Sequence, residues 1–294
     1  MEFICNLCPR QCGAKRTENE NIGGYCGMPS LPKIARAALH FGEEPCISGT
    51  RGSGTIFFSG CPLNCRFCQN APISQGGFGQ TISIQRLADI FRELEAAGAH
   101  NINLVNPGHF ANSICKAIEL YTPKIPVVYN SGGYERVETL KMLDGKINVY
   151  LPDCKYVDVA LSKTLSDAED YFQYAEDAIL EMARQTGPVQ LGADGLIRGG
   201  TIVRHLVLPS HTKESMAVLD KLAQHKDKFW VSLMFQYTPI GDISDIKGLD
   251  RTLTQRECDK MLDYMLSLGI TDGYTQSRAS AGVHMIPQFD LTGV

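Results

Sequence analysis

Residues 59–70 read Ser-Gly-Cys-Pro-Leu-Asn-Cys-Arg-Phe-Cys-Gln-Asn, with the spacing Cys-x3-Cys-x2-Cys at Cys61, Cys65 and Cys68. The segment directly follows Thr-Ile-Phe-Phe-Ser at residues 55–59, whose aromatic and β-branched side chains predict a short buried strand. Three thiolates on one short loop can hold three corners of a cubane iron–sulfur cluster. The fourth iron then has no protein ligand, which leaves the open position typical of catalytic metal sites. We therefore interpret the three cysteines as ligands of a catalytic 4Fe–4S cluster.

Other interpretations of these cysteines fit less well. A structural zinc site normally uses paired Cys-x2-Cys units with a fourth ligand, and no second pair follows Cys68. Disulfides are rare in a reducing compartment, where clustered cysteines more often bind metal. The carboxyl end of a parallel strand is also where α/β folds bind their ligands. Spacing and position therefore both favour a cluster site.

Strand and helix patterns alternate from residue 55 onward. The expected strands cover residues 55–59, 101–106, 126–130, 147–151, 202–208 and 230–235. The expected helices cover residues 84–97, 111–120, 135–143, 166–185, 214–224 and 254–268. We expect Ser166 to cap the fourth helix and Thr252 or Thr254 to cap the last, whereas residues 273–294 look irregular and are expected to fold back over the domain.

These six β/α units predict an α/β fold with a parallel sheet and outer helices. Six units are too few for a closed eightfold barrel. Periodicity alone leaves two architectures open, a partial barrel and a doubly wound sheet.

The composition is that of an ordinary globular protein. The chain has 294 residues and a net charge of −4, so no global attraction to nucleic acid is expected. No run of about 18 apolar residues occurs, so we expect no membrane span. The first residues lack the basic region and apolar run of a signal peptide, so we expect a cytoplasmic protein.

Cysteines are concentrated near the N-terminus, where eight of the 11 fall within the first 68 residues. The spacing Cys-x2-Cys-x3-Cys-x13-Cys joins four of them, Cys5, Cys8, Cys12 and Cys26. Four thiolates satisfy either a structural zinc ion or a fully ligated auxiliary iron–sulfur cluster, and the sequence does not separate the two. We divide the chain into a loop-rich, metal-stapled, cysteine-rich extension at residues 1–50 and a main domain at residues 51–294.

Polar residues stand where the expected strands end. Because the carboxyl ends of parallel strands share one edge of the sheet, we expect these side chains to border a common pocket. The candidate cofactor-binding residues, with the aromatic residue of the cluster loop, are Phe67, Asn106, Gly108, Asn130, Ser131, Asp153, Lys155, Arg204 and Gln236. Tight turns are the alternative for the residues at Asn106 and Asn130, and a surface ion pair is the alternative for Asp153 and Lys155.

Asp153 and Lys155 are the strongest pair in this set. Alternation along an extended chain points both side chains to the same side, and Cys154 between them to the other. The lysine can then meet a ligand carboxylate, and the aspartate can orient the lysine or bind a cation. Cys154 is expected to pack in the core. His109, after the second strand, is expected to be a packing residue more often than a catalytic one.

The cluster segment resembles the signature of the radical S-adenosylmethionine (SAM) superfamily, Cys-x3-Cys-x-aromatic-Cys, with Phe67 as the aromatic residue. More narrowly, the chain resembles the pyruvate formate-lyase type of glycyl radical enzyme activating enzyme that carries a cysteine-rich N-terminal extension. The segments that carry this resemblance are residues 5–13, 24–27, 57–70, 129–134, 150–156, 204–209 and 232–239.

The resemblance implies a partial (β/α)6 radical SAM barrel, a 4Fe–4S cluster and SAM as cosubstrate. It implies reductive cleavage of SAM to a 5′-deoxyadenosyl radical that abstracts hydrogen from a substrate, and an electron donor such as flavodoxin or ferredoxin. A glycyl radical protein would be the substrate. The alternative is modification of a peptide side chain or small molecule, which a redox cluster at the N-terminal cysteines would favour. A non-catalytic cluster or zinc module is the third possibility, and the open central site argues against it.

Two positions depart from the family patterns. The superfamily often places Gly-Gly-Glu after the second strand, where this chain has Asn106-Pro-Gly-His109. Activating enzymes have a carboxylate at the position of Asn130. Both departures concern residues expected to face the cofactor.

Overall fold

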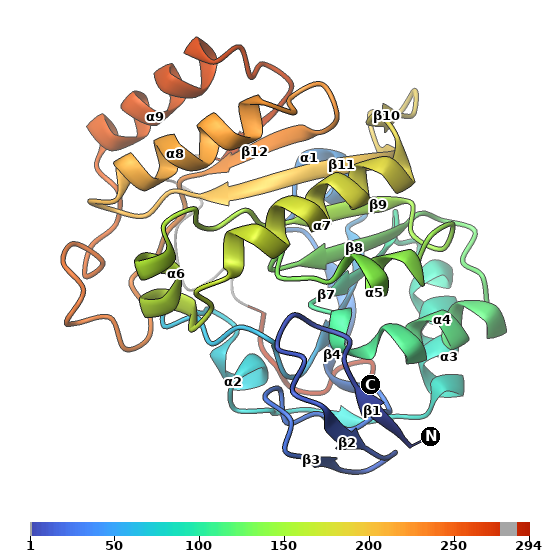
Figure 1. The fold of residues 1–294 in the computed structure, drawn as a ribbon. Helices are drawn as coiled ribbons and strands as arrows, with labels where there is room; N and C mark the ends of the chain where they lie inside the picture. The colour runs from blue at the N-terminus through green and yellow to red at the C-terminus, as the bar shows by residue number, and fades with distance from the viewer. Residues whose placement is uncertain (1, 277–286) are drawn as a thin grey trace.

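The computed structural model describes residues 2–276 and 287–294, and its main sheet contains a run of parallel strands in chain order (Figure 1). These strands are β5 (Ser53–Phe58), β7 (Ile102–Val105), β8 (Val127–Ser131), β9 (Val149–Pro152), β11 (Ile197–Leu206), β12 (Trp230–Met234) and β13 (Gly273–Gln276). Each strand pairs with its predecessor. A doubly wound sheet reverses direction at a switch point, so this order excludes it.

Short antiparallel strands complete the sheet. β4 (Lys33–His40) pairs with β5, β6 (Gln80–Thr81) pairs with β4, and β10 (Gln190–Leu191) pairs with β11. A separate N-terminal sheet contains β1 (Phe3–Cys5), β2 (Ala14–Arg16) and β3 (Asn21–Ile22), and it lies at the bottom of Figure 1. The last residues of the chain run beside β4, because Leu291 donates to Ala35 and Ala37 donates to Thr292 through the backbone.

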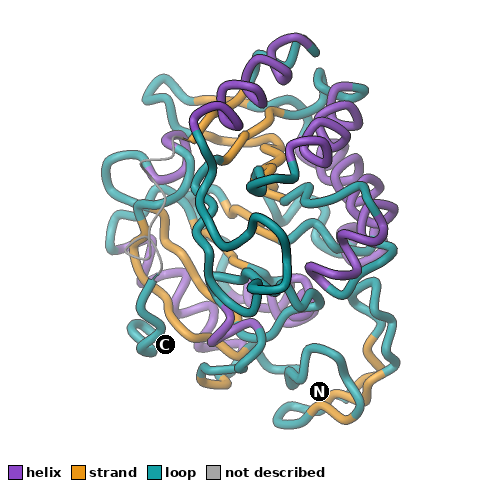
Figure 2. Tube along the Cα trace, turned by 90° about the vertical axis from the view of Figure 1, so that its left-hand side faces the viewer, coloured by secondary structure: helices purple, strands orange, loops and turns teal. Residues whose placement is uncertain are grey.

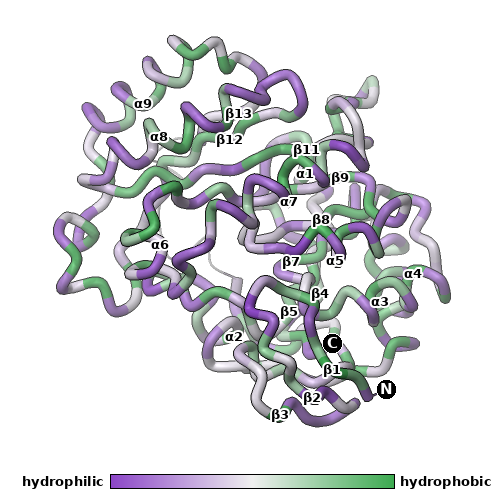
Figure 3. Tube along the Cα trace, in the orientation of Figure 1, coloured by the Kyte–Doolittle hydropathy of each residue, from purple (hydrophilic) through white to green (hydrophobic). Residues whose placement is uncertain are grey.

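The longer helices lie outside the parallel strands, as Figures 1 and 2 show. They are α3 (Ile84–Ala96), α4 (Ala111–Leu120), α5 (Val137–Lys141), α6 (Val159–Ser166), α7 (Tyr171–Thr186), α8 (Thr212–Ala223) and α9 (Gln255–Ser267). Short turns form α1 (Pro45–Ser48), α2 (Ala71–Ser74) and the 3₁₀ helix η1 (Gly108–Phe110). The hydropathy colouring alternates along α8 and α9, as expected for helices with one buried face (Figure 3). None of the helices in the described residues is long and apolar enough to cross a bilayer.

Both faces of the parallel sheet are covered. On the outer face, α3 and α4 bury Leu87, Phe91 and Ile114 against the strands in one large apolar cluster. On the inner face, Cys46 and Ile47 of α1 pack against strands β8, β9 and β11. Every residue of β5 is buried for this reason, which matches the continuous apolar pattern expected of a buried parallel strand.

The six strands expected from the sequence are confirmed to within five residues at each end, but three other expectations were wrong. Residues 33–40, expected to be loop-rich, form β4. Residues 273–276, expected to be irregular, form β13 beside β12; of the remaining expected irregular stretch, residues 277–286 lie outside the described residues and residues 287–294 form no helix or strand.

The third error concerns the start of the expected helix over residues 166–185, because the helix there, α7, begins only at Tyr171 and a separate helix, α6, precedes it. Ser166 is the last residue of α6 rather than an N-cap. Asp158 caps α6, where its side chain accepts a hydrogen bond from the backbone N–H of Leu161 at 2.7 Å. Asp167 then adopts a left-handed conformation with φ of 52°, which ends the helix because aspartate tolerates this region better than most residues. α7 begins only after this turn.

The sequence left Thr252 and Thr254 open as caps of the last helix. In the structure Thr254 caps α9, and it does so in a capping box. The Thr254 hydroxyl accepts from the backbone N–H of Glu257 at 3.3 Å, and the Glu257 carboxylate accepts from the backbone N–H of Thr254 at 2.8 Å. Thr254→Ala is expected to lower the free energy of unfolding by about 1 kcal/mol, measured by urea denaturation. Thr252→Ala is the control, since Thr252 is exposed, and its effect is expected within about 0.5 kcal/mol. Equal effects of the two substitutions would contradict the assignment of the cap.

Candidate active site

The cysteine loop begins directly after β5, at the carboxyl edge of the sheet, which faces the viewer in Figure 2. Gly60, with φ of 79°, turns the chain out of the strand. The loop is held from the side of α6, because Asn64 and Arg66 donate backbone hydrogen bonds to the carbonyls of Ser166 and Leu165. This attachment gives the broken helix a role that the sequence pattern did not predict.

Each of the three thiols has a polar neighbour. Cys61 accepts from the backbone N–H of Leu63 at 3.4 Å, Cys65 lies 3.0 Å from the Ser166 hydroxyl, and Cys68 lies 3.3 Å from the Ser74 hydroxyl. Burial raises the pKa of the Cys61 and Cys65 thiols, so they need a cationic partner to be stable as thiolates. Iron supplies that positive charge. The three thiols lie on one loop, and each has a different polar neighbour. This arrangement fits a cluster that takes one thiolate per iron.

A single metal ion, unlike a cluster, needs several ligating side chains that converge on one point. Within residues 2–276 and 287–294, no three Cys, His, Asp or Glu side chains are placed to ligate one ion. A cubane cluster does not require such convergence, because its iron atoms occupy separate corners. The donor set of the loop therefore matches a cluster better than a mononuclear site.

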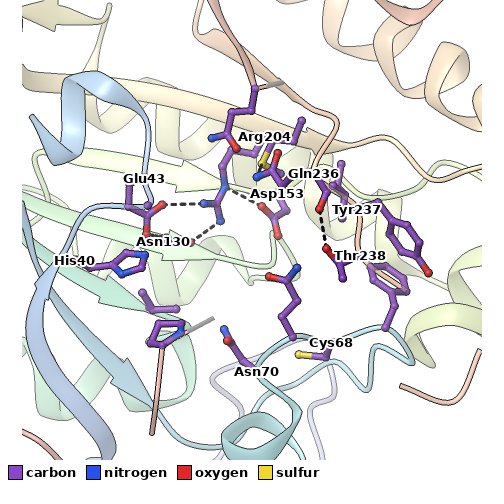
Figure 4. Close-up of a pocket in the computed structure, with 18 of the residues that line it drawn as sticks. His40, Glu43, Cys68, Asn70, Asn130, Asp153, Arg204, Gln236, Tyr237 and Thr238 are labelled. Atoms are coloured by element: carbon purple, nitrogen blue, oxygen red, sulfur yellow. Dashed lines mark hydrogen bonds and ion pairs between the residues drawn. The ribbon is translucent and has the colours of Figure 1, made fainter. Parts of the chain in front are cut away.

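A cavity of about 640 Å³ lies between the cysteine loop and the sheet (Figure 4). Its size is in the range of small-molecule sites. Cys65 and Cys68 border it on one side, and the opposite side is lined by side chains of the parallel strands. Of the candidate cofactor-binding residues, those that line this cavity are Phe67, Asn130, Asp153, Lys155, Arg204 and Gln236.

Arg204 is the centre of the polar network in the cavity. Its guanidinium contacts Asp153 at 3.0 Å, Glu43 at 3.2 Å and the Asn130 side-chain oxygen at 2.6 Å, as the dashed lines in Figure 4 mark. The Arg204 side chain is 15% exposed and its two carboxylate partners are 16% and 10% exposed. At such low exposure each charge depends on its partners, because water no longer solvates it fully.

Lys155 completes this network on the cluster side. Its ammonium group lies 2.5 Å from Asp153. Burial alone would raise the pKa of Asp153, but the charges of Lys155 and Arg204 outweigh it and hold that pKa below its ordinary value. Burial lowers the pKa of Lys155, and the charges of Asp153 and Cys65 overcome this and raise it above its ordinary value. Both groups are therefore ionised at neutral pH, and the lysine presents a fixed positive charge beside Cys65.

Asn106 lies behind the cysteine loop rather than in the cavity wall. Its side-chain nitrogen donates to the carbonyl oxygen of Gly60 at 2.6 Å, and its oxygen lies 3.7 Å from the Cys61 sulfur. The backbone of Asn106 is left-handed, with φ of 57°. Such strain is retained where the surroundings require it, often at functional sites. The placement supports a role in positioning Cys61.

Gly108 and Ser131 are not brought to the cavity. A β-carbon on Gly108 would lie 2.3 Å from a carboxylate oxygen of Glu135, so this glycine packs behind the sheet edge. The Ser131 hydroxyl accepts from the backbone N–H of Gly133 at 3.1 Å in a buried turn. His109 is buried as well, with a ring nitrogen 2.7 Å from the Ser59 carbonyl oxygen, in agreement with the packing role expected for it.

Glu43 is the functional candidate that sequence reasoning missed. It stands between β4 and α1, within residues 1–50, and yet its carboxylate reaches the cavity. Besides Arg204 it accepts from the side-chain amides of Asn130 and Asn103, at 3.1 and 3.0 Å. It thus supplies a carboxylate beside Asn130. The consecutive acidic residues Glu43 and Glu44 before Pro45 were the available signal.

Comparisons with known proteins agree with this architecture. A family model described as a 4Fe-4S single cluster domain matches residues 48–164. The uncharacterized protein MJ0674 of Methanocaldococcus jannaschii is 30% identical over 268 residues, which cover 88% of this chain and 73% of that protein.

Two solved structures have a similar fold. HydG, a maturase of the FeFe-hydrogenase, has a TM-score of 0.51 and 15% identity over 79% of this chain and 54% of its own, so this chain spans about half the length of HydG. Methylornithine synthase (PylB) has a TM-score of 0.50 and 15% identity over 82% of this chain and 72% of its own. The chain therefore belongs to the family of MJ0674, shares its fold with HydG and methylornithine synthase, and matches the 4Fe-4S single cluster model over the segment that contains its cysteine loop.

Proposed function

We propose that this protein is a radical SAM enzyme that cleaves SAM reductively and abstracts a hydrogen atom from a substrate held in the cavity. The observation that carries the proposal is the common cavity of Cys65, Cys68, Lys155 and Arg204. A reduced 4Fe–4S cluster, bound by Cys61, Cys65 and Cys68, would supply the electron that splits SAM into methionine and a 5′-deoxyadenosyl radical. The architecture proposed for this chemistry is a partial (β/α)6 barrel.

The protein's own groups would position the reactants. Lys155, held by Asp153, would bind the carboxylate of the methionine part of SAM, since an ammonium group in a site of low exposure attracts a carboxylate strongly. Asn106 would keep the cysteine loop in register through its bond to Gly60. The side chains of Phe67, Leu206 and Met234 line the same cavity and would exclude water from the reaction.

The proposal predicts SAM cleavage by the reconstituted protein. The full chain, reconstituted anaerobically with iron and sulfide, is expected to bind a 4Fe–4S cluster. Dithionite and SAM should then yield 5′-deoxyadenosine and methionine, quantified by liquid chromatography and mass spectrometry. An intact cluster, verified by its electron paramagnetic resonance signal, together with no 5′-deoxyadenosine above a protein-free sample would overturn the proposal. In the cell the electron would come from a donor such as flavodoxin or ferredoxin.

The finer proposal for the substrate is a glycine residue of a partner enzyme, as in glycyl radical activation. Its support is the sequence resemblance around residues 129–134 and 150–156. Incubation with a candidate partner is expected to produce a glycyl radical signal by electron paramagnetic resonance. If 5′-deoxyadenosine forms but none of the partners tested gives that signal, the alternative function gains support. In that alternative the enzyme modifies a peptide side chain or a small molecule and uses an auxiliary metal site at the N-terminal cysteines.

A further inference from the structure

The four N-terminal cysteines gather around the small sheet of β1, β2 and β3. Cys5 and Cys8 are buried, Cys26 is half-buried and Cys12 is exposed. Gly13 and Gly27, the residues directly after Cys12 and Cys26, have φ of 63° and 68°, so the chain turns sharply at both places. The small sheet brings their segments together, because Cys5 pairs with Ala14, Arg16 pairs with Asn21, and the Asn21 side chain reaches the Cys26 sulfur at 3.8 Å.

Some of these sulfur atoms accept N–H hydrogen bonds. Cys26 accepts from the side-chain amide of Asn21 at 3.8 Å. Cys5 accepts from the Arg16 guanidinium at 3.5 Å. Donors aimed at sulfur are typical of the surroundings of metal-bound thiolates, where they orient the ligands and stabilise their negative charge.

Arg16 is a buried cation that needs such a charge. Its side chain is 0% exposed. Its guanidinium donates to the carbonyl oxygens of His109 and Pro29 and lies over the rings of Phe3 and Phe110, and no ion pair in the described part of the chain includes it. Burying a cation without an anion costs several kcal/mol. Four thiolates around a divalent metal carry a net negative charge beside this guanidinium, whereas four neutral thiols do not.

The same segment presses against the loop of the central cysteines. A β-carbon on Gly60 would lie 3.0 Å from the carbonyl oxygen of Cys26 and 2.3 Å from the side chain of Met28. Arg10 donates to the carbonyl oxygen of Pro62 at 2.8 Å. These contacts stand on either side of Cys61 in the sequence, so the position of the N-terminal segment sets the position of this ligand.

We propose that Cys5, Cys8, Cys12 and Cys26 bind one metal–thiolate centre, a zinc ion or an iron–sulfur cluster, and that this centre holds the catalytic cysteine loop in place. The catalytic role of the loop that this centre holds rests on the proposed function. No three of these thiols converge on one point in the described residues, so a cluster fits them more directly, and a zinc ion would require the thiols to turn toward one point. For cysteine this means one torsion per side chain.

Metal content tests the centre separately from SAM chemistry. A full-length Cys61→Ala/Cys65→Ala/Cys68→Ala variant has no central ligands, so metal that it retains belongs elsewhere. This variant is expected to keep one zinc ion or one iron–sulfur cluster per chain, measured by elemental analysis and sulfide assay. Adding Cys12→Ser and Cys26→Ser should remove that metal, whereas adding Cys115→Ser, on α4, should not. The proposed centre would be overturned if metal is retained after Cys12→Ser and Cys26→Ser are added. It would also be overturned if the Cys61→Ala/Cys65→Ala/Cys68→Ala variant holds no metal.

Hydrogen exchange tests the link between the two sites. In the otherwise unmodified chain, Cys12→Ser/Cys26→Ser is expected to speed amide exchange at residues 59–70 by about tenfold, with β12 unchanged as an internal control for folding. Extraction of the metal with a chelator from the Cys61→Ala/Cys65→Ala/Cys68→Ala variant, whose remaining metal belongs to the N-terminal centre, should have the same local effect, which covers the case of a poorly folding Cys12→Ser/Cys26→Ser variant. Loss of metal with unchanged exchange at residues 59–70 would overturn the link and leave the proposed function untouched.

Discussion

Replacing Cys65 by alanine is expected to abolish SAM cleavage. Cys65 borders the cavity, and the charge of Lys155 opposes the rise in its pKa that burial causes. Without this thiolate, one iron of the cluster loses its protein ligand. The loop cannot shift to bring another ligand to that iron, because the backbones of Asn64 and Arg66 are hydrogen-bonded to α6. 5′-Deoxyadenosine formation should fall to the level of a protein-free sample, and the iron content should fall with it.

The matched control for this experiment is Cys115→Ala. Cys115 lies on α4, away from the cavity, and its thiol donates to the carbonyl oxygen of Met142. This variant should retain the cluster and cleave SAM at the rate of the unmodified protein. Cleavage that survives Cys65→Ala, or that is lost in both variants, would show that the ligands of the cluster have been assigned wrongly.

Arg204→Met is expected to lower the free energy of unfolding by about 3–5 kcal/mol, the usual effect of removing one partner from a buried ionic network. The substitution leaves Glu43 without its ionic partner and Asp153 with Lys155 alone, and both carboxylates are at most 16% exposed. Methionine has a similar length, so the loss reflects charge more than a cavity. Urea denaturation measures the change, and SAM affinity, measured by titration calorimetry, is expected to fall in parallel.

Arg198→Met provides the comparison on the same strand. Arg198 belongs to β11 as Arg204 does, and it pairs with Asp194 at 2.6 Å, but its side chain is 45% exposed. Exposed ion pairs contribute little, so an effect within about 0.5 kcal/mol is expected. If the two substitutions have equal effects, then the Arg204 network does not behave as a buried one.

Much of the site could be predicted because its signals are local. The cysteine spacing and the alternation of Asp153, Cys154 and Lys155 depend on only a few neighbouring residues, and the structure places Cys154 at 0% exposure as this alternation requires. The strands around them are short apolar runs between turns, a pattern that the sequence displays directly. The structure accordingly brings Asp153 and Lys155 to the cavity together.

The parts that could not be predicted depend on contacts between distant segments. Glu43 reaches Arg204 across 161 positions of sequence, and no periodic pattern reports such a contact. The break after Ser166 has a similar origin. The helical pattern runs on through residues 167–170, but the carbonyls at the end of α6 bind the cysteine loop, which is a tertiary requirement. β13 is short and pairs only at the edge of the sheet, so its four residues carry little signal.

The order of the parallel strands has a consequence for how this scaffold can change. Because each parallel strand is added beside its predecessor, the loops that follow β7, β8, β9, β11 and β12 open at the same rim as the cysteine loop after β5. New substrates could therefore be accommodated by exchanging the loops after β7, β8 or β12, while the part of the rim that carries the cysteine loop, anchored by α6, stays constant. Such separation of a fixed reaction from a variable specificity would make the chain readily adaptable in evolution and in protein engineering.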